Sequence, residues 1–310
     1  MKKSINIISA FILMAFTACN GDKKNNTAAT SEKIEITHEL GKTSLVENPQ
    51  KIVVFDMGTL ETLDELGIKV AGLPKKNLPS HLKKYADDPN IVDIGTMQEP
   101  NFEKINALGP DAIFVSNRQQ AVYGELNKIA PTVYFNTYDK NYMNALESKM
   151  KTLGQIFKKE DELNAKVAQL KKEIETSNTE ISKSDKKGLI LLYNKGKFSA
   201  YGKGSRFGFV HDVMGVKPAI EDLEVATHGQ PVSNELILKT NPDYIFIVDR
   251  NAAVESIPTN KAEIENVMIQ KTNAFKNGKI TYLDAGYWYL SGGGTASTQQ
   301  MIKDVQQTVN

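Results

Sequence analysis

The sequence predicts an α/β fold of two lobes with mainly parallel sheets, separated by a helical segment. Three observations lead to this prediction: short apolar runs alternate with helical patterns, a helix-rich stretch divides the chain near its middle, and one motif occurs in each half. Strands that alternate with helices form parallel sheets covered on both faces, so each half should build its own sheet. A chain of 310 residues is long enough for two domains of about 150 residues each.

The first 18 residues are typical of an export signal. A basic start and a mostly apolar run lead to two small residues and then Cys19. Cys19 is the only cysteine, which excludes a disulfide framework and a cysteine-based structural zinc site. An exported protein rarely keeps one free thiol, so we expect Cys19 to be lipidated after cleavage. Residues 19–36 are assigned to this lipidated cysteine and a flexible tether, because the stretch is polar and has little to bury.

The next segments are two lobes and a connection. Residues 37–140 are expected to form the first lobe, with strands at 51–56, 91–95, 112–116 and 133–136 and a helix that ends before Gly67. In residues 141–184, two series of apolar residues repeat at i, i+4, i+7 and i+11. They predict one long amphipathic helix, or two helices broken near Lys158–Asp161. Residues 185–310 are the second lobe, with strands at 189–194, 244–249 and 280–284.

The repeated motif joins a glutamate, a Pro-Asp turn, a buried strand and an arginine. In both halves the glutamate precedes the proline by seven positions, and the arginine follows the proline by eight. The glutamates are Glu103 and Glu235, and the arginines are Arg118 and Arg250. Ligands of open α/β sheets bind beyond the carboxyl ends of the strands, so both arginines should face a ligand.

The chain contains 38 lysines and arginines in total, and only three of them are arginines. The third arginine, Arg206, follows the glycine-rich turn 202–205. In a chain that otherwise uses lysine, an arginine is expected where binding requires the planar fork of donors of a guanidinium group. Three such groups in one place would suit a compact anion of high charge with aromatic groups. Scattered structural ion pairs are the alternative reading of the same residues.

Composition and motifs exclude several classes of function. Lys plus Arg is 38 and Asp plus Glu is 37, so a broad surface for nucleic acid is not expected. No apolar run reaches the roughly 20 residues that span a bilayer. The chain lacks the GxSxG, HExxH and Walker motifs of common hydrolases and nucleotide-binding enzymes. The run Ser291–Thr295 also lacks phosphate-loop spacing and is expected to lead into a helix.

Over essentially the whole chain after the export signal, and through six segments in particular, the sequence resembles the lipoprotein substrate-binding components of ABC importers for ferric catecholate siderophores, of the enterochelin-uptake and petrobactin-binding type. These segments are NLPSHL (77–82), FEKINALGPDAIFVSNRQ (102–119), SRFGFVHDVMG (205–215), THGQ (227–230), NPDYIFIVDRN (241–251) and YLDAGYWYLSGGG (282–294). The resemblance implies a class III, helical-backbone substrate-binding protein. Its two lobes would be joined by a single long helix, with the ligand between them.

The resemblance also implies the roles of particular residues. Arg118, Arg206 and Arg250 would bind a ferric siderophore, whose tris-catecholate complex carries a charge of about −3. His228 and Tyr289 would complete the Fe(III) coordination sphere when the siderophore supplies only two catecholates. Taken alone, a loop histidine is more often solvated, and a tyrosine in an aromatic cluster more often packs a core. His38, His81 and His211 are interpreted as surface or structural residues.

The remaining implications concern partners and location. Glu103 and Glu235 would dock on an ABC permease dimer that works with ATPase subunits. We expect a monomer without catalytic activity or intrinsic cofactor, which carries Fe(III) only as the siderophore complex. It would lie in the periplasm or on the outer face of the cytoplasmic membrane, anchored by lipid on Cys19. The alternatives are haem, cobalamin or a hydroxamate siderophore in the same fold, or an esterase or phosphatase that acts on a polyanion.

Overall fold

The computed structural model describes residues 32–136, 141–255 and 257–310, within the unit formed by residues 32–310. The expected export signal and the lipidation of Cys19 lie outside the described residues. The boundary expected for the tether, residue 36, is wrong, because residues 33–36 already belong to an antiparallel hairpin. Its strands are β1 (Lys33–His38) and β2 (Gly41–Val46). Side chains alternate in this hairpin, and Ile36 and Leu45 are buried while their neighbours face outward.

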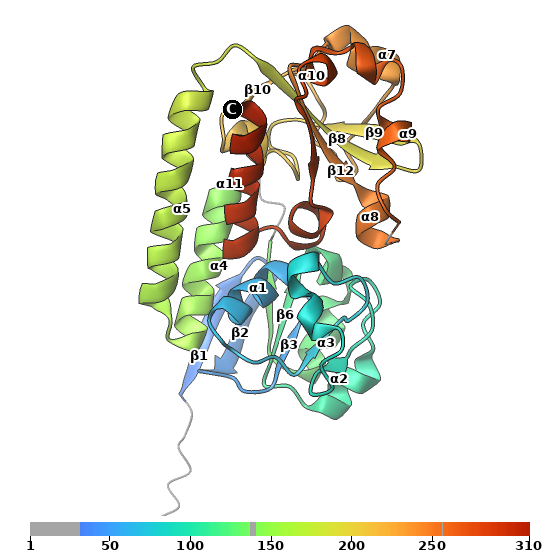
Figure 1. The fold of residues 1–310 in the computed structure, drawn as a ribbon. Helices are drawn as coiled ribbons and strands as arrows, with labels where there is room; N and C mark the ends of the chain where they lie inside the picture. Colours follow the sequence, from blue (N-terminus) through green and yellow to red (C-terminus); the bar gives the residue numbers. More distant parts are fainter. Residues whose placement is uncertain (1–31, 137–140, 256) are drawn as a thin grey trace, which may run out of the picture. The chain divides into compact units, whose positions relative to one another are not determined.

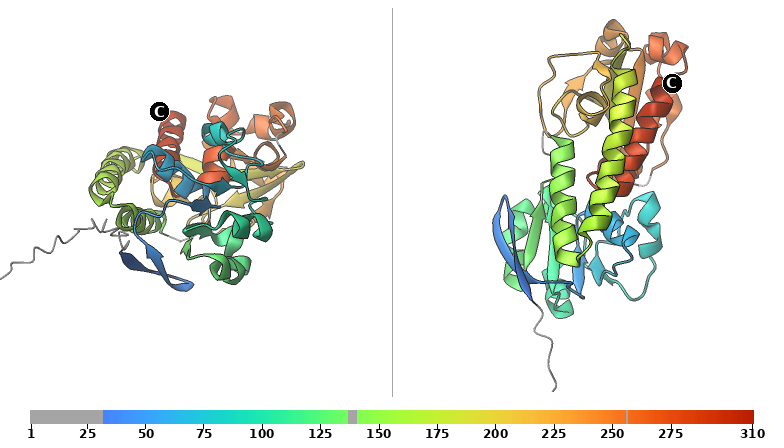
Figure 2. Two further views of the ribbon diagram at one scale, coloured as in Figure 1. Left: turned by 90° about the horizontal axis from the view of Figure 1, so that it is seen from below. Right: turned by 90° about the vertical axis from the view of Figure 1, so that its left-hand side faces the viewer.

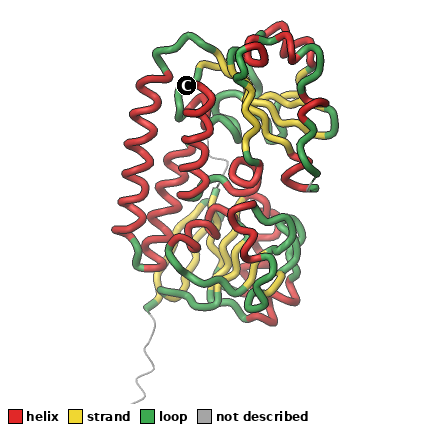
Figure 3. Tube along the Cα trace, viewed as in Figure 1, coloured by secondary structure: helices red, strands yellow, loops and turns green. Residues whose placement is uncertain are grey.

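The first lobe contains the expected parallel sheet, with strand order β5-β4-β3-β6-β7. The strands are β3 (Ile52–Val54), β4 (Gly72–Leu73), β5 (Val92–Asp93), β6 (Ala112–Ser116) and β7 (Thr132–Phe135). Helical segments connect them: α1 (Met57–Glu65), η1 (Ser80–Tyr85), α2 (Phe102–Leu108), η2 (Asn117–Val122) and α3 (Tyr123–Ile129). Strands β3 and β6 are buried throughout because helices cover both faces (Figure 3).

The connecting segment consists of two helices, α4 (Tyr142–Phe157) and α5 (Glu160–Ile181). The chain turns at Lys158, whose positive φ of 55° ends α4 in the left-handed region. This position agrees with the expected break near Lys158–Asp161. Helix α5 runs beside both lobes, from the first at the bottom of Figure 1 to the second at the top. It is therefore the long helix that joins them.

The second lobe has a mixed sheet with the order β11-β9-β8-β12-β13, and β10 also pairs with β8. The pairs of β8, β10, β12 and β13 are parallel, whereas β9 and β11 are antiparallel additions. The strands are β8 (Lys187–Asn194), β9 (Lys197–Tyr201), β10 (Lys217–Pro218), β11 (Gln230–Val232), β12 (Tyr244–Asp249) and β13 (Ile280–Leu283). The expectation of mainly parallel sheets is thus confirmed, with one antiparallel edge.

Short helices surround this second sheet. They are α6 (Phe209–Asp212), α7 (Asn234–Thr240), α8 (Arg250–Val254), α9 (Lys261–Ile264), η3 (Ile269–Lys271) and α10 (Asn273–Lys276). A π-helical turn, η4 (Gly286–Ser291), then leads through glycines into α11 (Thr295–Val309). Helix α11 lies alongside α5, and its beginning packs on α1 of the first lobe (Figure 2). The glycine-rich run is therefore the helix-entry turn that the sequence predicted.

The repeated motif has the same structure in both lobes. Helices α2 and α7 each have seven residues and end on a left-handed residue, Gly109 or Asn241, directly before Pro-Asp. Asp111 accepts a hydrogen bond at 2.8 Å from the backbone nitrogen that precedes β3, and Asp243 accepts one at 2.9 Å from the first nitrogen of β8. Each motif thus attaches its own strand to a neighbouring strand of the sheet. Within the described part of the chain, no helix is long and apolar enough to cross a bilayer.

Candidate functional site

Arg118 lies directly after β6 on the short helix η2. Ser116 and Gln119 form a capping box, and the buried Gln119 side chain also donates to the carbonyl of Met97. These contacts fix the turn that carries the partly buried Arg118. Its Nη2 donates to the carbonyl oxygen of Tyr289 at 2.8 Å, although the two residues are 171 positions apart.

Arg250 occupies the equivalent place in the second lobe, at the first position of α8 after β12. The buried Asp249 is the N-cap, and its carboxylate accepts a hydrogen bond from the Asn251 nitrogen at 2.9 Å. Arg250 is partly buried, and its Nε donates to the hydroxyl oxygen of Tyr289 at 3.2 Å. The sequence prediction that both arginines follow strand ends is confirmed.

Arg206 comes from the glycine-rich turn after β9. Gly204 has a φ of 64°, which favours glycine, and its nitrogen donates to Asp212 at 2.6 Å. The guanidinium of Arg206 lies over the Tyr289 ring at 4.1 Å and over the Phe207 ring at 5.2 Å. It also donates to the Tyr289 carbonyl oxygen. The three arginines of the chain therefore meet at Tyr289.

The charges around Tyr289 change its acidity. Partial burial raises the pKa of the phenol, but the charges and hydrogen bonds of Arg206 and Arg250 outweigh burial and lower it below the usual 10.0. This phenol therefore loses its proton more easily than a free tyrosine does, and a phenolate oxygen is a hard donor that suits Fe(III). The arrangement can hold an anionic group by the guanidinium forks and can offer one oxygen ligand.

His228 lies on an exposed turn directly before β11. The turn is anchored because the next residue, Gly229, packs so closely on Tyr201 that a Cβ would come within 2.6 Å of its ring. Tyr201 in turn packs edge-on against Phe207, with ring centroids 4.7 Å apart. The histidine loop therefore lies beside the Arg206 turn. Among the described residues, however, no hydrogen bond or ring contact joins His228 to Tyr289.

Glu103 and Glu235 are both exposed and both lie in the first turn of their helices, α2 and α7. Hydrogen bonds from Ser233 and from its own backbone lower the pKa of the Glu235 carboxyl. A large apolar side chain is exposed next to each glutamate: Phe102 at 36% and Leu236 at 37%. Each lobe thus presents an acid with an adjacent apolar side chain.

A cavity of about 450 Å³ lies close to the arginine site. Its walls combine residues 77–80 of the first lobe with residues 282–286 of the second. Asp249, Ala252 and Leu290, which also line it, are close neighbours in sequence of Arg250 and Tyr289. Within the described residues, no three His, Cys, Asp or Glu side chains gather into a metal site.

The other three histidines have structural contacts. Nδ1 of the buried His211 donates to the Val216 carbonyl at 2.8 Å, and His38 hydrogen-bonds Thr43 at 2.9 Å. His81 pairs with the buried Glu61 at 2.9 Å. The backbone carbonyl of Tyr289 as an acceptor and the Glu61–His81 pair are not predicted from the sequence. The only sequence signal for the Glu61–His81 pair is that His81 lies in NLPSHL (77–82), one of the segments that carry the resemblance.

Comparison with known proteins identifies the chain's relatives. The model of a family described as periplasmic binding protein matches residues 52–287. The petrobactin-binding protein YclQ of Bacillus subtilis is 43% identical over 99% of this chain and 98% of its own. Its crystal structure superposes with a TM-score of 0.87 at 44% identity, and the match covers 90% of this chain and 99% of that one.

Two further solved structures are similar. The siderophore-binding protein BauB, bound to a complex of two acinetobactin molecules and ferric iron, is 37% identical with a TM-score of 0.84. That match covers 90% of this chain and 99% of BauB. The periplasmic catecholate-siderophore-binding protein VctP of Vibrio cholerae is 32% identical with a TM-score of 0.82, covering 89% and 100% of the two chains.

Proposed function

The chain belongs to the periplasmic binding protein family, and on that premise we propose that it captures ferric catecholate siderophores for an ABC importer of iron. The observation that carries this proposal is the meeting of Arg118, Arg206 and Arg250 at Tyr289. The proteins similar to it bind petrobactin, a ferric acinetobactin complex or catecholate siderophores, as their names state. The assignment is a binding function without catalysis.

The charge of the ligand fits the arginines. A ferric tris-catecholate combines Fe³⁺ with six phenolate oxygens and carries a charge of about −3, which three guanidinium groups offset. Guanidinium groups can also form cation–π contacts with catecholate rings. Arg206 already makes such a contact with the Tyr289 ring, at 4.1 Å from the ring centroid. A neutral ferric hydroxamate has no net negative charge to offer these guanidinium groups.

For a siderophore with only two catecholates, the protein would supply the missing iron ligands. Tyr289 would provide a phenolate oxygen, and the lowered pKa of its phenol favours this form. His228 would provide a neutral imidazole from the loop beside the Arg206 turn. Because His228 is exposed on this turn, its imidazole is accessible to an iron complex.

The other proposed features concern delivery. Lipid on Cys19 would anchor a monomer in the periplasm or on the outer face of the cytoplasmic membrane, with residues 37–140, 141–184 and 185–310 as its lobes and connection. Glu103 and Glu235 would dock on the two subunits of a permease dimer that works with ATPase subunits. Their equivalent positions in the two lobes support this proposal, since a dimer offers two like surfaces.

A ligand panel tests the proposed function. Trp288 is the only tryptophan and is the neighbour of Tyr289, so its fluorescence should be quenched by an iron complex in the site. We expect strong saturable quenching by ferric bis- and tris-catecholates, and weak or no binding of haem, cobalamin and a ferric trihydroxamate. Preferential binding of any of the last three would contradict the proposal. Turnover of a chromogenic ester or phosphate would instead support an enzyme.

A further inference from the structure

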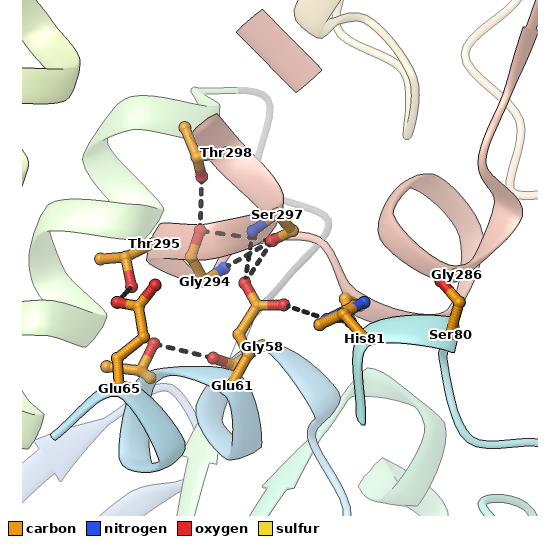
Figure 4. A network of polar contacts seen from close by, with 12 residues as sticks. Gly58, Glu61, Glu65, Ser80, His81, Gly286, Gly294, Thr295, Ser297 and Thr298 are labelled. Atoms are coloured by element: carbon orange, nitrogen blue, oxygen red, sulfur yellow. Dashed lines mark hydrogen bonds and ion pairs between the residues drawn. The ribbon is translucent and has the colours of Figure 1, made fainter. Parts of the chain in front are cut away.

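The first lobe holds the segment that carries Tyr289 through a buried carboxylate and a histidine. Glu61 on α1 is 1% exposed, and its Oε2 lies 2.9 Å from Nε2 of His81 on η1, whose side chain is 13% exposed. Its other oxygen, Oε1, accepts hydrogen bonds from the nitrogen and the hydroxyl of Ser297 at 2.8 and 2.6 Å. Figure 4 shows this network between α1, η1 and the start of α11. One carboxylate thus links three elements.

The approach of α1 to α11 leaves no room for larger residues. A Cβ on Gly294 would collide with the Glu61 carboxylate, and one on Gly58 would collide with the Gly292 carbonyl. Next to Glu61, Glu65 accepts a hydrogen bond from Thr295 at 2.6 Å. The end of the Tyr289 segment is therefore fixed to the first lobe at Thr295 and Ser297.

His81 contacts the π-helical turn η4 itself. Its ring stacks on Tyr287, with centroids 4.0 Å apart and planes inclined by 6°. Its Nε2 also lies 3.5 Å from the hydroxyl of Ser291, the last residue of the turn. One residue earlier, Ser80 donates to Asp284 at 3.1 Å, just before the turn begins. The η1 segment therefore touches both ends of η4.

Tyr289 lies between these contacts. Its carbonyl accepts from Arg118 and Arg206, and its hydroxyl accepts from Arg250. The last carbonyls of a helical turn have no partner within the turn, so they are available to side chains such as these. Rotation of η4 by even a small angle would move the carbonyl and the phenol together. Accurate placement of Tyr289 thus requires that η4 be held from outside.

We propose that Glu61 and His81 form a positioning pair that holds η4 against the first lobe and so sets Tyr289 for the iron complex. Glu61 fixes the orientation of the His81 ring by hydrogen bonding, and the ring fixes Tyr287 by stacking. Neither residue is among those proposed to bind the siderophore. The effect on ligand affinity rests on the proposed function, whereas the holding of η4 is a property of the ligand-free protein.

The test compares His81→Phe with His38→Phe. Both changes replace a histidine ring that has one side-chain oxygen within 2.9 Å and an aromatic neighbour, but His38 is on β1 and contacts Thr43 and Tyr123. We expect amide hydrogen exchange of residues 286–291 to be about tenfold faster in His81→Phe, as loss of one hydrogen bond suggests. His38→Phe should leave it unchanged. His81→Gln keeps a donor toward Glu61 and should restore part of the protection.

Ligand binding gives the second readout. His81→Phe should weaken the binding of a ferric bis-catecholate about 10- to 100-fold, as is usual for residues that orient a metal ligand. Exchange of 286–291 at the wild-type rate in His81→Phe, or equal exchange in His81→Gln and His81→Phe, would overturn the proposal. If His81→Phe does not fold, Tyr287→Leu replaces it as the test variant. This change removes the ring on which His81 stacks, and it must accelerate amide hydrogen exchange of residues 286–291. If the wild type binds no ferric catecholate, the proposed function fails, but the exchange comparison still decides this proposal.

Discussion

Tyr289→Phe separates iron coordination from the organisation of the arginines. The change removes the hydroxyl that accepts from Arg250 at 3.2 Å. It leaves the backbone carbonyl that accepts from Arg118 and Arg206, and it leaves the ring beneath the Arg206 guanidinium. A ligand that fills the iron sphere by itself should therefore be affected little. A ligand with four donor oxygens should lose one protein ligand.

The magnitude follows from these contacts. Changes next to a metal ligand cost about 10- to 100-fold in affinity, and loss of the ligand itself should cost at least as much, or about 1.4–2.7 kcal/mol. We expect this loss for a ferric bis-catecholate. For a ferric tris-catecholate, Arg250 loses a hydrogen bond to Tyr289 but gains the siderophore as partner, so the change should stay within about threefold.

Titrations followed by Trp288 fluorescence measure both affinities, and the visible charge-transfer band of the bis-catecholate complex reports the iron ligands. The band should shift between wild type and Tyr289→Phe. Tyr287→Phe is the matched control, because it removes a hydroxyl from the same helical turn without a proposed iron ligand. Equal losses for both siderophores, or an unchanged band, would refute direct coordination by Tyr289.

Three further predictions concern acidity, delivery and stability. Arg206→Gln should raise the pKa of the Tyr289 phenol, because a cation that lowers it is removed; an ultraviolet titration that matches wild type would contradict this. Replacing Glu103 and Glu235 by Gln should leave siderophore affinity unchanged but reduce cellular iron uptake, and normal uptake would exclude the docking role. Burial lowers the pKa of His211 below 6.5, so the unfolded chain takes up a proton first as the pH falls and the free energy of unfolding should decrease below about pH 6.5. The slope is at most about 1.4 kcal/mol per pH unit for this group. Urea unfolding at pH 7.5 and 5.5 should show a smaller decrease in His211→Gln, and an equal decrease would contradict the assignment.

The sequence was sufficient for the parts of the fold that local pattern determines. The strands 112–116 and 244–249 are continuous apolar runs because both faces of each parallel sheet are covered, and their bounds agree with β6 and β12. The repeated Glu, Pro-Asp and Arg spacing identified equivalent strand ends, because each Asp is bonded to a neighbouring strand. The break at Lys158 was also predictable, since the apolar series changes phase there.

Elements that depend on distant partners were not predictable in the same way. The hairpin β1–β2 has one buried face and a polar composition, so its first strand was assigned to the tether. The π-helical form of residues 286–291 has no local signature, and it decides where the Tyr289 carbonyl points. His81 was identified as surface or structural, but its bond to Glu61 depends on the packing of α1, η1 and α11. These contacts are set by tertiary structure.

The most direct test of a site made by three guanidinium groups is the affinity of the single variants Arg118→Lys, Arg206→Lys and Arg250→Lys for a ferric tris-catecholate. Each lysine keeps the positive charge but loses the planar fork that reaches two oxygens. We expect the dissociation constant to rise about fivefold or more in each variant, equivalent to about 1 kcal/mol. Wild-type dissociation constants in all three would contradict the account.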